Sequence, residues 1–83
     1  MTNYRERMRN LREDSDLTQA EVAKYLKVKQ NTYSQYENGQ RGLPVDVLIR
    51  LAEFFRTSTD YILGLTDNKK PYPRKGEKKK STG

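Results

Sequence analysis

The sequence predicts an all-α fold, a compact bundle of five short helices. Apolar residues recur at the three- and four-residue spacings of amphipathic helices, and no segment shows the alternation of a half-buried strand. Helix-capping residues and polar or glycine-containing breaks separate the periodic segments, and no segment repeats another. We expect residues 1–66 to form one domain and residues 67–83 to form a disordered basic C-terminal tail.

The first predicted helix spans residues 4–14. Tyr4, Met8 and Leu11 fall on one stripe with the spacing i, i+4, i+7, and Arg and Glu occupy the other faces. The polar run at residues 14–16 ends this helix.

A second helix is predicted from Thr18 to Leu26. Thr18 and Glu21 have the S/T-x-x-E spacing of a capping box, so the first helical residue should be Gln19. A third helix follows from about Gln30 to Asn38. The two helices share positions expected to be buried: Val22, Leu26, Val28, Tyr33 and Tyr36.

A fourth helix is expected after the loop at residues 39–42. Pro44 suits its first turn, and it should run to about Phe55. It has two apolar stripes, one with Val45, Leu48, Ile49, Ala52 and Phe55 and one with Val47, Leu51 and Phe54. One stripe must close the core, and the other is either more core or a partner surface. Ser58 is the expected N-cap of a fifth helix, residues 59–63, which Gly64 ends.

Composition excludes several classes of protein. The 83 residues include no Cys and no His, so a thiolate zinc site, a disulfide and the commonest general acid/base are all missing. No segment approaches the roughly 20 apolar residues of a membrane span, and the first ten residues lack an apolar signal region. We expect a soluble cytoplasmic protein with no cofactor, no metal and no enzymatic activity, since no catalytic constellation or glycine-rich phosphate loop is recognisable.

The positive charge is concentrated near the C-terminus. Of the net charge of +6, residues 1–64 contribute little, with ten Lys or Arg against nine Asp or Glu, whereas residues 65–83 have seven against two. The tail is therefore either a solubilising end or a basic arm that follows phosphates, and the sequence leaves both open.

The outward side of the third helix carries amides and a hydroxyl. Gln30 and Ser34 are i, i+4 neighbours, and so are Asn31 and Gln35, which places all four on one face. A carboxamide can donate to and accept from an adenine edge at once, and Ser can do either at any base. This pattern favours base contacts, although an ordinary polar surface is the simpler alternative.

Residues 17–39 resemble the Cro/cI-like (XRE-type) helix-turn-helix family. The resemblance rests on QAE at residues 19–21, Ala23, Val28 and YENG at residues 36–39. Leu11-Arg12 and TDYILGLTD at residues 59–67 extend it more weakly. The chain departs from the family at Lys27, where the turn usually has Gly, and at Lys29, where Ser or Thr usually caps the second helix of the motif.

The resemblance implies a repressor-type DNA-binding bundle in which the third helix enters the major groove. Gln19, at a helix N-terminus, is then a phosphate contact, and Arg12 pairs with Glu37 to hold the scaffold together. Further phosphate contacts are expected at the two ends of the third helix: Lys29, Asn38, Gln40 and Arg41. Tyr33 and Tyr36 fit the buried set better than a role in stacking on single-stranded bases.

We therefore expect a sequence-specific double-stranded DNA-binding protein, most simply a transcriptional repressor. Because one such domain buries little surface, two copies should bind a pseudo-palindromic operator as a homodimer. No small-molecule ligand is evident. An antitoxin that also binds a protein toxin is the alternative within DNA binding, and a protein–protein adaptor is the alternative outside it.

Overall fold

The computed structural model describes residues 3–72, and within that range it is entirely helical, with no strand. The helices are α1 (Tyr4–Asp14), α2 (Gln19–Leu26), α3 (Gln30–Asn38), α4 (Val45–Phe54) and α5 (Thr59–Leu63). The predicted all-α fold and its element order are confirmed. Two bounds differ by one residue, because Pro44 is the N-cap of α4 and Phe55 is its C-cap.

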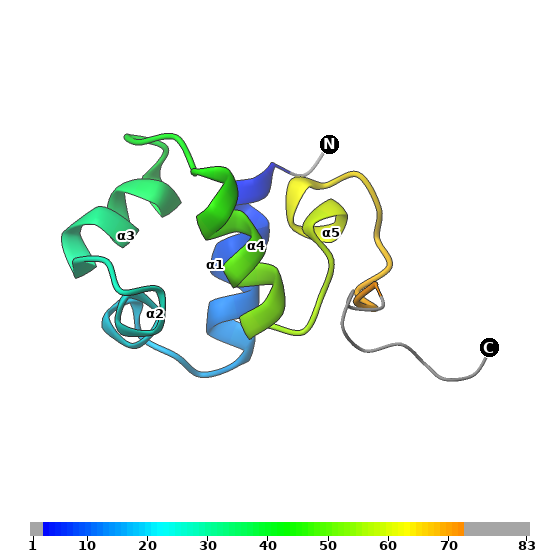
Figure 1. Cartoon of the computed structure of the whole chain (residues 1–83), viewed down its shortest axis with the longest axis horizontal. Helices are drawn as coiled ribbons and strands as arrows, with labels where there is room; N and C mark the ends of the chain where they lie inside the picture. The colour runs from blue at the N-terminus through cyan, green and yellow to red at the C-terminus, as the bar shows by residue number, and fades with distance from the viewer. Residues whose placement is uncertain (1–2, 73–83) are drawn as a thin grey trace.

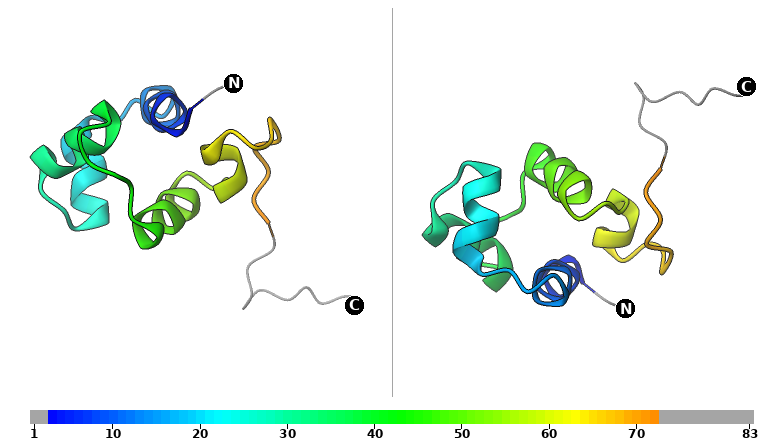
Figure 2. Two further views of the ribbon diagram at one scale, coloured as in Figure 1. Left: turned by 90° about the horizontal axis from the view of Figure 1, so that it is seen from above. Right: turned by 90° about the horizontal axis from the view of Figure 1, so that it is seen from below.

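The helices form a short row rather than a parallel bundle. In Figure 1, α1 and α4 lie in the middle, α2 and α3 lie at one end, and α5 lies at the other. The views from above and below show the same order (Figure 2). Contacts between α2 and α3, α1 and α3, and α1 and α5 hold this arrangement together. The α2–α3 pair therefore projects from a scaffold made by the other helices.

Local sequence signals explain the helix ends. Thr18 Oγ1 accepts from the Glu21 backbone N–H at 3.1 Å, and Glu21 Oε1 accepts from the Thr18 N–H at 2.8 Å. This is the predicted capping box, which satisfies two backbone donors that no intrahelical acceptor can reach. Ser58 caps α5 in the predicted way, and Gly64 ends α5 in a left-handed conformation.

A single apolar core lies between the five helices. Each of the five helices contributes to its largest fully buried side chains: Met8, Val22, Leu26, Tyr33, Leu51 and Ile62. Of the buried set predicted for α2 and α3, all but Val28 are in this core, and Val28 packs against its edge. Both tyrosines of α3 are therefore core residues, as expected.

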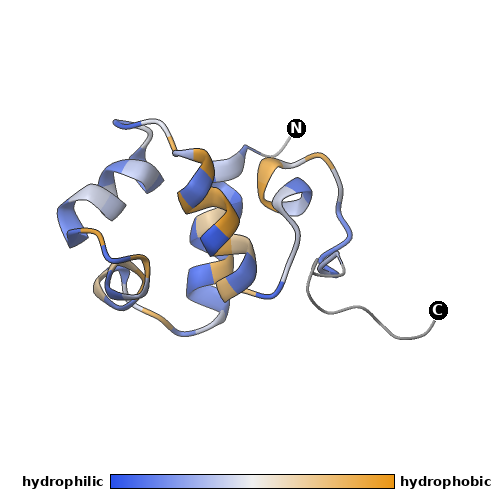
Figure 3. Ribbon diagram, in the orientation of Figure 1, coloured by the Kyte–Doolittle hydropathy of each residue, from blue (hydrophilic) through white to orange (hydrophobic). Residues whose placement is uncertain are grey.

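The packing of α4 against the other helices shows which of its apolar residues are buried. Val47 and Leu51 face the core, with exposures of 6% and 0%, whereas Val45 and Ile49 are 71% and 45% exposed. Phe54 is partly buried and stacks on Tyr25 of α2 at 4.2 Å between ring centroids. The stripe with Val47, Leu51 and Phe54 thus faces the core. The other stripe is divided, because Ala52 is also buried in the core and Leu48 and Phe55 pack against it, whereas Val45 and Ile49 are exposed. In Figure 3, α4 carries broad orange, hydrophobic bands, whereas α3 is mainly pale or blue and so mainly hydrophilic.

The segment after α5 returns to α1. Arg7 of α1 is a buried residue, with 8% of its surface exposed. Its guanidinium donates to the carbonyls of Tyr61 and Thr66, both at 3.1 Å, and to the carboxylate of Asp67 at 2.7 Å. Residues 67–72 belong to the predicted tail. The rest of that tail, residues 73–83, lies outside the described residues, and the domain boundary at residue 66 stays a prediction.

Candidate nucleic-acid interface

The turn between α2 and α3 is short and closely packed. Lys27 ends α2 with φ 61°, a left-handed conformation, and the Val28 N–H donates to the Ala23 carbonyl at 3.0 Å. Ala23 is 2% exposed, so α3 approaches α2 at a position that has no room for a larger side chain. Lys29, the N-cap of α3, makes no side-chain capping bond. Lys27 thus adopts the left-handed conformation without being Gly, and Lys29 leaves the N-terminus of α3 without a side-chain cap. The two helices still pack against each other.

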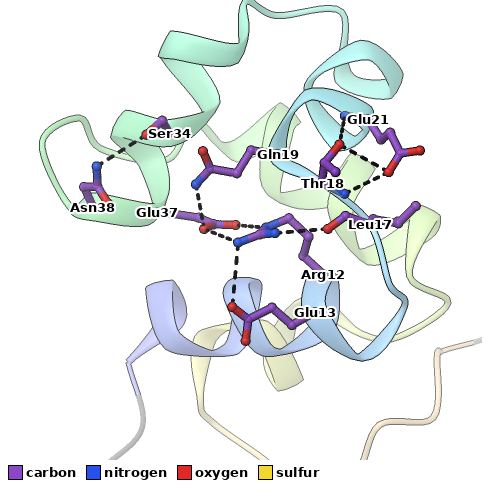
Figure 4. A network of polar contacts seen from close by, with 9 residues as sticks. All are labelled: Arg12, Glu13, Leu17, Thr18, Gln19, Glu21, Ser34, Glu37 and Asn38. Atoms are coloured by element: carbon purple, nitrogen blue, oxygen red, sulfur yellow. Dashed lines mark hydrogen bonds and ion pairs between the residues drawn. The ribbon is translucent and has the colours of Figure 1, made fainter.

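A buried polar network joins α1, α2 and α3 (Figure 4). Arg12 donates to Glu37 through Nε at 2.7 Å and through Nη2 at 3.1 Å, and its Nη1 donates to the Leu17 carbonyl at 3.0 Å. Gln19 Nε2 also donates to Glu37, at 3.1 Å. The bidentate geometry fixes the direction of both planar groups. The network therefore sets the position of α3 on the scaffold.

Electrostatics keep this network ionised. Burial of the Glu37 side chain, which is 2% exposed, would raise its pKa, but the hydrogen bonds from Arg12 and Gln19 outweigh burial and leave the pKa lowered. The Glu37 hydrogen bond likewise raises the pKa of Arg12. Burial raises the pKa of the neighbouring Tyr33, and the ionised Glu37 beside it raises that pKa further. All three groups thus hold their ordinary charge states at neutral pH.

The four predicted base-contacting residues lie together on α3. Gln30 and Asn31 are exposed, and Ser34 and Gln35 are half-buried. Ser34 Oγ accepts a long hydrogen bond of 3.4 Å from Asn38, and Gln35 Oε1 accepts one of 2.9 Å from Arg41 Nε. The only carboxylate of α3 is the buried Glu37. The outward face therefore offers amides and a hydroxyl with no negative charge to repel phosphates.

The predicted phosphate-contacting residues border α3 at its two ends. Lys29 precedes α3, and Asn38, Gln40 and Arg41 follow or end it; all four are exposed. Gln19 differs, because it is half-buried and one of its amide hydrogens is used on Glu37. A phosphate at the start of α2 would therefore meet the first-turn backbone N–H groups and the remaining amide hydrogen.

Sequence reasoning missed Arg5. Its guanidinium packs against Gly39 at the end of α3, where a Cβ on that glycine would lie 2.9 Å from Arg5 Cζ. The sequence could have indicated this contact. Arg5 lies seven residues before Arg12 on α1, so the two side chains share one helix face, and Arg12 was already expected to pair with Glu37 of α3. Arg50 is also structural, since it donates to the Leu26 carbonyl at the end of α2 at 3.2 Å.

Neither a metal-binding cluster nor a membrane-spanning helix is present among the described residues. Among residues 3–72, no group of three or more acidic side chains is placed to hold a metal ion. Each helix in the same range is too short or too polar to span a lipid bilayer.

Known proteins with similar sequences are regulators. A family model described as Helix-turn-helix matches residues 8–62, more than half of the chain. The uncharacterized HTH-type transcriptional regulator YobD of Bacillus subtilis (strain 168) is 38% identical over 68 residues, which cover 82% of this chain and 61% of YobD. ImmR, an HTH-type transcriptional regulator of the same organism, is 36% identical over 58 residues, 70% of this chain and 46% of ImmR.

A third relative is named as a repressor. The cryptic phage CTXphi transcriptional repressor RstR of Vibrio cholerae is 36% identical over 52 residues, which cover 63% of this chain and 47% of RstR. The chain thus spans about half to three fifths of the length of these relatives. No solved structure matches it significantly.

Proposed function

The chain belongs to the helix-turn-helix family of transcriptional regulators, which are DNA-binding proteins and not enzymes, and we propose that it represses transcription by reading an operator with α3. The observation that carries this proposal is the outward face of α3. Its exposed amides stand on a helix whose opposite side is fixed by the buried Arg12–Glu37 pair. A rigid helix with free donors and acceptors is what base readout in the major groove requires.

Residues on this face divide into two roles. Gln30 and Asn31 lie nearest the N-terminus of α3 and reach deepest into the groove, where they contact base edges. Ser34 and Gln35 lie one turn further along and contact the next bases. The residues at the ends of α3 hold the phosphates and set the register of the domain: Lys29, Asn38, Gln40 and Arg41, with Gln19 at the start of α2.

Repression fits the size of the domain and its relatives. Occupying a promoter requires no surface beyond the DNA-binding face, and one of the relatives, RstR, is itself named as a repressor. A domain of this size buries too little DNA for high affinity alone, so two copies bind the two halves of a pseudo-palindromic operator. The spacing of the half-sites would then follow the two-fold axis of the homodimer.

Selection of bound sequences from a random double-stranded DNA pool tests the proposal. We expect the full chain to enrich one motif with two inverted half-sites about one helical turn apart. A motif with a single half-site would contradict the homodimer while leaving sequence-specific binding intact. Equal recovery of all sequences would contradict the proposal itself.

A further inference from the structure

The chain after α3 folds back onto Gln35. Gly39 turns the backbone with φ 78°, and the Gln35 carbonyl then accepts from the N–H groups of Gln40 at 2.9 Å and Arg41 at 3.3 Å. The Arg41 side chain returns to the same residue, with Nε 2.9 Å from Gln35 Oε1. Three hydrogen bonds therefore link residue 35 to the two residues that follow the turn.

The chemistry of Arg41 fixes which way the Gln35 amide points. A guanidinium only donates hydrogen bonds, so the amide atom that faces it must be the oxygen. The NH₂ group of Gln35 consequently points away from Arg41, with two hydrogens to offer. Gln30 differs, because no hydrogen bond within the described residues holds its side chain, and its amide can turn either way.

We infer that Arg41 is a positioning residue that presents Gln35 to DNA as a hydrogen-bond donor. The inference rests on the proposed reading of DNA by α3. Bidentate readout of adenine needs the amide oxygen for N6 and the NH₂ group for N7. Because Arg41 occupies one lone pair of that oxygen and turns it toward the chain after α3, Gln35 instead favours a base whose polar groups in the major groove are all acceptors, namely guanine or thymine.

Arg41 also links this base contact to the DNA backbone. It is exposed and forms no ion pair among residues 3–72. Its hydrogen bond to Gln35 uses Nε and leaves both terminal nitrogens for a phosphate. A phosphate bound there would hold the guanidinium in place and, through it, the orientation of the amide. Sequence preference at this base pair thus depends on a residue that need not touch a base.

The test compares base preferences of four forms of the full chain on randomised DNA: the parent, Arg41→Ala, Gln35→Ala and Lys29→Ala. Gln35→Ala identifies the base pair that Gln35 reads, as the position where preference is lost. At that position Arg41→Ala should improve adenine relative to guanine or thymine by about five- to tenfold. Lys29→Ala is the matched control, since it removes one exposed charge at the other end of α3 and should weaken all sequences equally.

The double variant Gln35→Ala/Arg41→Ala completes the cycle. The change in preference caused by Arg41→Ala should vanish when Gln35 is already absent, because the effect passes through that amide. The inference is overturned if Arg41→Ala behaves like Lys29→Ala, if its effect persists without Gln35, or if Gln35→Ala keeps parental preferences everywhere. In those three cases the parent still selects a motif and the proposed function stands. A parent that selects no motif overturns both.

Discussion

Removing Glu37 is the most informative perturbation of the scaffold. The change Glu37→Ala leaves the Arg12 guanidinium, whose side chain is 13% exposed, without its two carboxylate hydrogen bonds. It also leaves the Gln19 amide hydrogen without its acceptor. Breaking one side of a buried pair costs about 3–5 kcal/mol. Because Arg12 keeps its bond to the Leu17 carbonyl, we expect the lower end, about 3 kcal/mol.

Thermal unfolding followed by circular dichroism measures this loss. For a domain of this size, about 3 kcal/mol corresponds to a decrease in Tm of roughly 12–24 °C. Glu13→Ala is the matched control, since Glu13 is 58% exposed and lies 4.0 Å from the same guanidinium. It should cost no more than about 0.5 kcal/mol. If Glu37→Ala melted together with Glu13→Ala, the buried network would not be what holds α3 on the scaffold.

Three further predictions concern stability. In Arg12→Ala, burial should raise the pKa of Glu37, which is lowered in the parent. The raised pKa destabilises the variant at pH 7, and the lowered pKa stabilises the parent there; both effects shrink as the pH falls into the range where an ordinary carboxyl group takes up a proton. The gap in Tm between variant and parent should therefore be wider at pH 7 than at pH 4. A gap independent of pH would exclude this linkage. Lys27→Gly should stabilise the domain in chemical denaturation by about 0.5–1 kcal/mol by relieving φ 61°, and unchanged stability would show that the turn is unstrained. Phe54→Glu should lower Tm markedly, whereas Ile49→Glu, at an exposed position of the other stripe, should change stability by about 0.5 kcal/mol or less. The opposite order would contradict the assignment of Phe54 to the core side and of Ile49 to the surface.

Local signals in the sequence predicted the helices well. The capping box at Thr18 and Glu21 and the N-cap at Ser58 involve residues three apart, so their geometry is set by the backbone of one turn. The family resemblance marked Lys27 as the turn position where Gly is usual, and this residue is left-handed in the structure. These features need no knowledge of tertiary contacts.

Features that depend on tertiary packing were not predictable in the same way. Periodicity found two apolar stripes on α4, but only its contacts with α2 and α5 decide which is buried. The bonds from Arg7 to Tyr61 and Thr66 join segments more than 50 residues apart. The Arg41–Gln35 bond depends on the path of the chain after Gly39, which helical periodicity does not describe. Burial of the Gln19 amide against Glu37 likewise follows from the packing of three helices.

Direct readout by the amides of α3 is most directly tested by the binding of Gln30→Ala to the preferred operator, measured across a range of salt concentrations. Gln30 is exposed and uncharged, so its loss should cost about 1–3 kcal/mol on that site and relax selectivity at one base pair. The slope of log K against log salt should stay that of the parent, whereas Lys29→Ala should flatten it by about one unit. If Gln30→Ala bound every sequence as the parent does, α3 would not be reading bases through its amides.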